Sequence, residues 1–292
     1  GQKLRGAPLG VVNEEAVLVL DGAGFGFATS FSTLAATDLT VDAPIQASRG
    51  DCAFCAIDLS AETGTVTTTM RGTLDVRGTG GLGGGGAIEL IAGANVDLYG
   101  AVLGTAAGSV EEGGAAGGSL GVVAMEGSIT TVGSVDLRGA EPDGDGGSVS
   151  VDAALDVRVA APVLVRTEGG GAGGTATLLG GRSVVLESSL DARGGAFDGG
   201  TIDVVAAGTL TTLGTATLLA DGRSGGAGGR IVLDGCGVDV RAGAVLSSLG
   251  PGGAPFAGTR LTARGAMTFA GTLRADGAAG THVLVSRATP PQ

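Results

Sequence analysis

The amino-acid sequence predicts an all-β chain folded as a parallel β-helix, a solenoid whose coils each supply three short strands. Three observations predict this class: 60 of the 292 residues are glycine, a paired-glycine signature recurs about every 28 residues, and the segments between signatures alternate apolar and polar residues. The glycine share is about three times the usual one, but it lacks the period of three and the high proline content of collagen. With 43% apolar residues the chain has the material for a packed core, which excludes a disordered chain.

The rest of the composition narrows the classes of partner. Charged residues make up 16% of the chain, with a single lysine, and this is too few to cover many helices. The formal net charge of −12 argues against nucleic acid and anionic membranes as partners, because both need a cationic face. No apolar run approaches the length of about 18 residues that crosses a membrane as a helix, so no membrane span is expected.

The recurring signature consists of two small residues, a spacer and an alternating strand. Its strong copies begin at Gly85, Gly117, Gly146, Gly173, Gly199 and Gly228, and weaker copies begin at Gly258 and Gly280. Two further short strands, for example 209–213 and 216–220, follow before the next copy, and the second one usually runs into a glycine-rich corner. These connections are too short for helices, so each strand is expected to pair with its equivalent in the next coil. Alternation with period two places Ile202 and Val204 inside and Asp203 outside.

The repeats divide the chain into three parts. We expect residues 72–287 to form the regular β-helix, residues 1–71 an N-terminal cap with the first irregular coils, and residues 288–292 a tail. Four of the seven phenylalanines lie in the first 54 residues, and an open solenoid end, with its apolar cross-section and unpaired strand edges, needs such atypical coils. The tail is short, so the C-terminal end is expected to be poorly covered and open to a partner.

These motifs resemble bacterial secreted β-helix proteins, among them the glycine-rich passenger regions of autotransporter and filamentous-haemagglutinin-like adhesins. The pattern is GG-x-[IVL]-x-[VIL]-x-A, then A-G-x-[LVI], then [LV]-x-[AVL]-x-G, and it covers roughly Gly72 to Arg287. The resemblance implies a right-handed, exported coil that serves as a rigid stalk or adhesive rod. We therefore expect an extracellular or cell-surface structural protein, either an adhesin or a filament subunit that stacks end to end. A surface glycan or a host receptor is a further expected partner.

Residues suited to catalysis are few, so no enzymatic activity is expected. The single histidine, His282, lies in an apolar terminal strand without a nucleophile motif. Glycosidases use paired carboxylates, but the adjacent acidic pairs 14–15 and 111–112 lie outside the regular strands. Sugar-binding platforms favour tryptophan and tyrosine, and the chain has one tyrosine and no tryptophan. The competing interpretation is a polysaccharide-processing enzyme or a glycan-binding module on the same scaffold.

Two groups of side chains are candidate sites for a ligand or a cross-link. Asp143 and Asp145 share a flexible corner and carry the oxygen ligands that Ca²⁺ takes, although their spacing is not that of an EF-hand loop; a solvated turn is the alternative. Cys52 and Cys55 have the spacing of half a zinc site, but a second pair of ligands is missing. A local disulfide, or two buried thiols, is therefore favoured over metal. Beyond calcium, no cofactor is expected.

Overall fold

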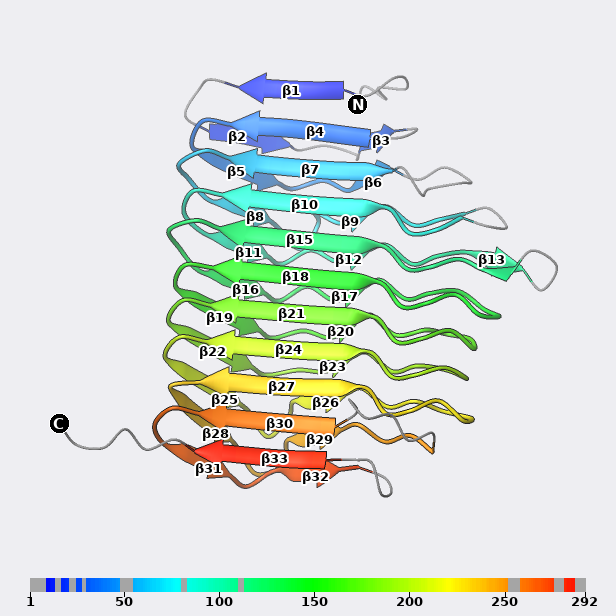
Figure 1. Ribbon diagram of the computed structural model, residues 1–292. Helices are drawn as coiled ribbons and strands as arrows, with labels where there is room; N and C mark the ends of the chain where they lie inside the picture. The colour runs from blue at the N-terminus through cyan, green and yellow to red at the C-terminus, as the bar shows by residue number, and fades with distance from the viewer. Residues whose placement is uncertain are drawn as a thin grey trace.

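The computed structural model describes residues 9–13, 17–20, 25–27, 30–47, 55–79, 83–109, 113–251, 258–275 and 281–286. Within these ranges the chain forms strands and turns and no helix. Figure 1 shows the strands stacked as a solenoid, from β1 (Leu9–Asn13) at one end to β33 (Thr281–Ser286) at the other. The strands nearest the viewer point left while the chain descends, so the solenoid is right-handed, as the resemblance implies.

Three parallel sheets run along the solenoid, and each coil adds one strand to each of them. Sheet A contains, in order, β1, β4 (Ser30–Ala35), β7 (Ala56–Ala61), β10 (Ala87–Ala92), β15 (Ser119–Ala124), β18 (Ser148–Ala153), β21 (Thr175–Gly180), β24 (Thr201–Ala206), β27 (Arg230–Gly235), β30 (Gly258–Ala263) and β33. Sheet B contains β2 (Val17–Leu20), β5 (Asp38–Val41), β8 (Val66–Thr68), β11 (Val96–Leu98), β16 (Ile129–Thr131), β19 (Asp156–Val159), β22 (Ser183–Leu186), β25 (Thr209–Thr212), β28 (Gly237–Val240) and β31 (Met267–Phe269).

Sheet C contains β3 (Phe25–Phe27), β6 (Ile45–Ala47), β9 (Leu74–Asp75), β12 (Val102–Leu103), β17 (Val135–Asp136), β20 (Val163–Leu164), β23 (Leu190–Asp191), β26 (Thr217–Leu219), β29 (Val245–Ser247) and β32 (Thr272–Arg274). A small antiparallel pair joins β13 (Gly108–Ser109) to β14 (Gly113–Gly114). The predicted class is confirmed, with three strands and about 28 residues per coil. Across the described residues, ten strands in each of sheets B and C and eleven in sheet A make ten three-strand coils and the start of another.

The alternation of apolar and polar residues decides which side chains form the core. Along β24, burial alternates as predicted, with Ile202, Val204 and Ala206 fully buried. Strands pair in register, so that Ile202 has Ala176 on one side and Ile231 on the other. Inward side chains therefore stack in columns along the solenoid, and burial of each large aliphatic side chain contributes about 1.5–3 kcal/mol.

The coil architecture begins before residue 72, where the sequence analysis placed the start of the regular repeats. β4 pairs in register with β7, and β7 with β10. β1, β2 and β3 pair in the same way with β4, β5 and β6. The described part of residues 1–71 therefore adds strands to the same three sheets, and its role as a cap stays a prediction. The signature does not mark these coils because no glycine pair precedes β4 or β7.

The weaker signatures at the C-terminal end are offset from the structural register. Ile231 pairs with Thr259, and Thr259 with His282, whereas the repeated pattern aligned Ile231 with Leu261 and Val283. These two copies lack the second glycine of the pair, so the sequence did not fix their alignment. The side chain of His282 lies outside the described part of the chain.

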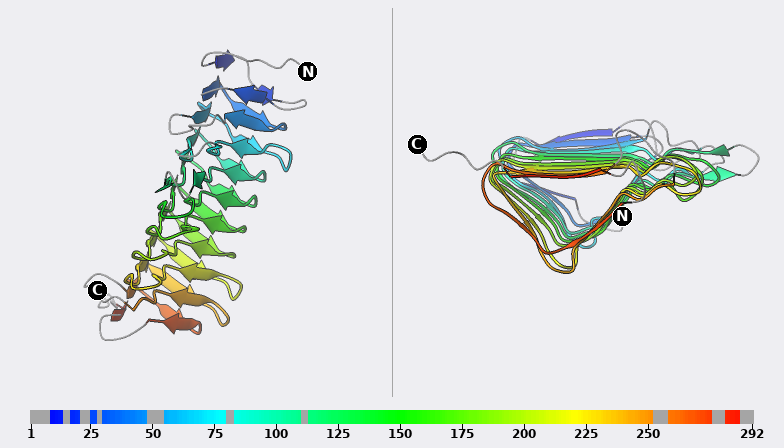
Figure 2. Two further views of the ribbon diagram at one scale, coloured as in Figure 1. Left: turned by 90° about the vertical axis from the view of Figure 1, so that its right-hand side faces the viewer. Right: turned by 60° about the horizontal axis from the view of Figure 1, so that its bottom comes forward.

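The glycine-rich corner extends from the triangular cross-section of the solenoid as a flattened fin (Figure 2). In the coils from β9 to β27 the chain leaves sheet C along an outgoing segment and returns to sheet A along an incoming segment. Outgoing segments of neighbouring coils hydrogen-bond to one another, as from Leu137 N to Leu164 O at 2.8 Å, and incoming segments do the same, as from Gly146 N to Ala172 O at 2.9 Å. The fin is thus two layers of stacked, extended backbone, and its outer face carries the side chains discussed below.

Candidate functional site

The glycine pair of each signature lies at a neck, where the fin joins the coil. Gly174, the second glycine of its pair, donates its N–H to Val165 O of the outgoing segment at 2.7 Å, which closes the neck. A Cβ on Gly174 would lie 2.0 Å from Gly147 O of the preceding coil, and a Cβ on Gly173 would lie 2.0 Å from Ala192 O of the following coil. Since both obstacles are backbone atoms, no side-chain rotation relieves them. The signature therefore records a packing requirement, the close approach of three backbone segments.

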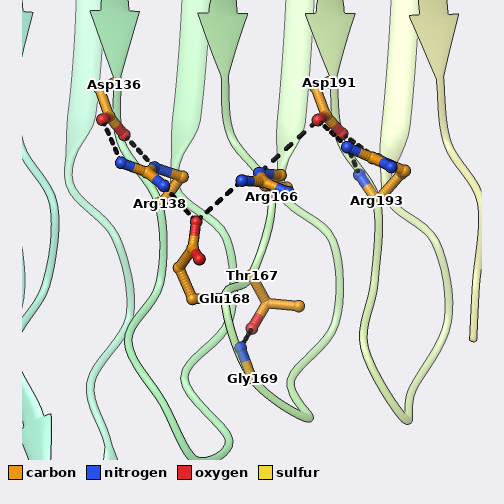
Figure 3. A network of polar contacts seen from close by, with 8 residues as sticks. All are labelled: Asp136, Arg138, Arg166, Thr167, Glu168, Gly169, Asp191 and Arg193. Atoms are coloured by element: carbon orange, nitrogen blue, oxygen red, sulfur yellow. Dashed lines mark hydrogen bonds and ion pairs between the residues drawn. The ribbon is translucent and has the colours of Figure 1, made fainter.

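A row of ionic contacts runs along the outgoing segments where sheet C ends (Figure 3). Asp191 accepts hydrogen bonds from Arg193 Nε at 2.8 Å and Nη2 at 2.7 Å. Asp136 accepts the two equivalent hydrogen bonds from Arg138 Nε and Nη2, each at 2.7 Å. Residues i and i+2 of an extended segment lie on the same face, so an Asp-x-Arg sequence forms this bidentate pair locally. The pKa of Arg138 and that of Arg193 are both raised, and the hydrogen bonds to Asp136 and Asp191 are the largest cause of this rise.

The coil between these two pairs departs from the pattern. Arg166 has Leu164 in the place of the aspartate, so it contacts Glu168, two residues further on, at 3.0 Å. Its Nε lies 3.6 Å from Asp191 of the next coil, and this buried atom has no hydrogen-bond partner within the described ranges. Glu168 also accepts a hydrogen bond from Arg138 of the preceding coil. These contacts connect six side chains over three coils, which we call the arginine ladder: Asp136, Arg138, Arg166, Glu168, Asp191 and Arg193 (Figure 3).

Two grooves on the fin flank Glu168 and differ in charge. The first, which we call the arginine groove, has a volume of about 350 Å³ and presents three guanidinium groups and one carboxylate, from Arg166, Arg193, Arg223 and Glu168. Its remaining walls are glycine, alanine, threonine and serine. The second groove, of about 390 Å³, carries Arg138 with two carboxylates, and so has the opposite balance of charge.

A third groove, of about 410 Å³, lies over the glycine necks of four coils. Glycines and the first residues of β10, β15, β18 and β21 line it, and Asp145 is its one charged side chain. Hydroxyl groups of Ser119, Ser148 and Thr175 are its other polar side chains. This groove follows directly from the absence of Cβ atoms at the necks, since any larger residue there would fill it.

The candidate calcium ligands make structural hydrogen bonds in different directions. Asp143 Oδ1 accepts the N–H of Gly114 at 2.7 Å, in the preceding coil, and Asp145 Oδ1 accepts that of Ala172 at 2.7 Å, in the following coil. Both residues are exposed. The described part of the chain contains no group of three or more metal-ligating side chains. The arrangement shows two carboxylates that each tie one fin segment to its neighbour, and whether calcium binds remains a prediction.

The cysteines occupy different environments. Cys55 is buried and disulfide-bonded, whereas Cys236 is an exposed free thiol. Cys52, its expected partner, lies outside the described residues. Cys55 immediately precedes β7, so its cross-link lies at the corner that leads into sheet A.

Sequence reasoning missed one pair of carboxylates on the outward face of sheet A. Asp58 in β7 and Glu89 in β10 are register partners on adjacent strands. Burial raises the pKa of Asp58, and the charge of Glu89 raises it further. No local pattern could reveal this pair, because only the coil register brings residues of two different repeats together. Neither residue lines any of the three grooves.

Among the described residues, the apolar core is only partly covered at its C-terminal end. Met267, Phe269 and Leu273 pack against the core but are only partly buried. Their register partners one coil earlier, Val238, Val240 and Leu246, are at most 2% exposed. Among the described strands, β31, β32 and β33 each have a single neighbour in their sheet, so backbone donors and acceptors on their outer edges have no strand partner.

Comparison of the chain with protein-family models, with curated proteins and with solved structures finds no match. In the part of the chain that the structure describes, no helix is long and apolar enough to cross a membrane.

Proposed function

We propose that the protein is a rigid extracellular rod whose C-terminal end binds the N-terminal end of a second copy. The observation that carries the proposal is the open core at β31 and β32, where Met267, Phe269 and Leu273 are only partly covered. Burying such side chains is favourable by about 25 cal/mol per Å² of apolar surface. An end of this kind is stabilised by a further coil.

The opposite end of the rod offers the matching edges. β1, β2 and β3 begin sheets A, B and C, and each has one neighbour among the described strands. All strands within a sheet run parallel, so a second copy placed head to tail continues each sheet in the same direction. Such a contact is heterologous, because it joins two different surfaces, and if its rotation does not close it builds a filament.

One feature supports an extracellular location, and two others suit a rigid rod. The disulfide bond of Cys55 is a cross-link typical of oxidising compartments. The net charge of −12 and the continuous backbone hydrogen bonding of the solenoid suit a stable, soluble rod. Presentation of this rod at a cell surface, as an adhesin, is the other use that we infer from the same rigidity, with a surface glycan or receptor as its partner.

The alternative function, a polysaccharide-processing enzyme, has one observation in its favour. Asp58 and Glu89 form a carboxylate pair, and glycosidases require two such groups. The pair lies on the outward face of a sheet, however, and it lines none of the grooves described above. We therefore favour the structural role. Turnover of an acidic or neutral polysaccharide that is lost in the Asp58→Asn variant would reverse this preference.

Sedimentation velocity and negative-stain microscopy test end-on association. Ten coils at about 4.8 Å per strand give a rod about 50 Å long, so the chain should form particles of multiples of this length as its concentration rises. Leu273→Asp places a charge at the open end and should leave single rods. Leu155→Asp changes a leucine that is 39% exposed on a turn between sheets A and B, and it should assemble like the wild type. Single rods of wild type at every concentration, or equal assembly of Leu273→Asp, would contradict the proposal.

A further inference from the structure

The arginine groove is a cationic site on an acidic protein. Three of the 17 basic residues of the chain line it, and one carboxylate, that of Glu168, faces them. Arg166 and Arg193 expose about a quarter of their side chains, and Arg223 is exposed. The neighbouring groove on the other side of Glu168 has two carboxylates and one arginine, so it does not attract anions in the same way.

Several of the guanidinium donors in this groove have no acceptor in the part of the chain that the structure describes. Arg193 engages Asp191 through Nε and Nη2, and Nη1 has no acceptor among the described residues. Arg166 uses Nη2 for Glu168. In the described part of the chain Arg223 makes no ion pair and no side-chain hydrogen bond, although Asp221 lies two residues before it. Asp221 instead accepts hydrogen bonds from Ser247 Oγ and Leu249 N, both at 2.7 Å, and is therefore committed to the next coil.

The geometry points to a carboxylate- or sulfate-bearing saccharide as the ligand of the arginine groove, with Arg223 and Arg193 binding its anionic group. A guanidinium group offers a planar fork that matches carboxylate and sulfate oxygens. The volume of about 350 Å³ is in the range of small-molecule sites. The lining contains no large apolar side chain to anchor a peptide. The hydroxyl of Thr167 is occupied by hydrogen bonds to Gly144 O and Gly169 N, so the exposed hydroxyl of Ser224 is the one that suits a hydroxylated ligand.

Isothermal titration calorimetry on the whole chain at low ionic strength tests the inference. The probes are a galacturonic acid hexamer, a sulfated hexasaccharide, a neutral glucose hexamer, a hexaglutamate peptide and sodium sulfate. We expect both acidic saccharides to bind and the other three probes to bind at least tenfold more weakly. Binding should weaken as salt is raised, because exposed charges are screened.

Arg223→Gln should weaken binding of the acidic saccharides about tenfold, as expected for loss of a charge-assisted hydrogen bond. Arg241→Gln is the matched control, since Arg241 is 57% exposed, lies on another part of the coil and carries the same charge; it should change affinity by less than twofold. Arg223 is exposed and has no side-chain partner among the described residues, so its replacement should leave the melting temperature unchanged.

Each other outcome overturns the inference. No binding of either acidic saccharide, or equal binding by Arg223→Gln, removes the site. If the neutral hexamer binds equally well, charge does not determine binding. If hexaglutamate binds equally well, the ligand is not specifically a saccharide. If sulfate alone binds equally well, the groove is a site for small ions only. The inference is independent of end-on association, because Arg223 lies between β26 and β27 and not in the C-terminal coil, and Leu273→Asp should bind the acidic saccharides as the wild type does.

Discussion

Replacing Gly174 by alanine should disrupt the neck of its coil and destabilise the solenoid by about 3–5 kcal/mol. The new Cβ would lie 2.0 Å from Gly147 O and 2.3 Å from Val165 O, so the backbone would have to move by about 1 Å to reach an acceptable contact. Overpacking of this kind costs about 1–3 kcal/mol. The movement also strains two hydrogen bonds, Gly174 N to Val165 O at 2.7 Å and Thr175 N to Gly147 O at 3.0 Å, and each is worth about 1 kcal/mol.

Thermal and urea unfolding, followed by far-ultraviolet circular dichroism, measures the effect. For a chain of this size the loss corresponds to a fall in melting temperature of about 10 °C, and hydrogen exchange should show faster exchange first in the coils of β18 and β21. Gly121→Ala is the matched control, because its Cβ would lie 4.0 Å from the nearest atom, Ile88 O, on the outward face of β15. It should be neutral or slightly stabilising. A Gly174→Ala variant within 1 kcal/mol of the wild type, with unchanged exchange, would refute the packing argument.

Three further predictions concern charged groups. The hydrogen bond from Arg182 holds the pKa of Asp156 at about 2, below the ordinary value of about 3.9. The stabilising contribution of Asp156 is therefore complete above pH 4 and is lost as the pH falls towards 2. Acid titration of the Asp156→Asn variant should show a shallower loss of stability in that window, and a titration identical to that of the wild type would contradict this. Burial and the charge of Glu89 raise the pKa of Asp58, so the charged form of Asp58 opposes folding at neutral pH. The Asp58→Asn variant should therefore have a higher urea midpoint at pH 7, by an amount equivalent to about 0.5 kcal/mol, and a smaller gain at pH 4. A lowered midpoint would show that the carboxylate is needed. Because Asp143 and Asp145 each bond to backbone N–H groups, a calcium chelator should leave the melting temperature unchanged, and a fall on chelation that added calcium restores would instead identify a metal site.

The repeat could be recognised in the sequence because equivalent positions of successive coils need the same kinds of residue. Inward positions such as Ile202 must be apolar, and neck positions such as Gly174 must lack a Cβ, so the period appears directly in the residues. The boundary expected at residue 72 rests on where the recurring signature begins. No glycine pair precedes β4 or β7 in the sequence, so these coils carry no signature, although their strands join the same sheets.

The candidate sites depended on contacts between coils, which the sequence of one repeat does not contain. Asp-x-Arg pairs are local and visible in the sequence, but the bridging role of Glu168 between Arg138 and Arg166 exists only because neighbouring coils stack in register. The same stacking places Asp58 beside Glu89 and gathers Arg193 and Arg223 around one groove. The sequence by itself determined the class of fold, the three-strand coil and its period, because local sterics and periodic burial dictate them. Only the tertiary structure decided which side chains from different coils face one another, since an offset of a single residue between coils would have produced a different set of neighbours.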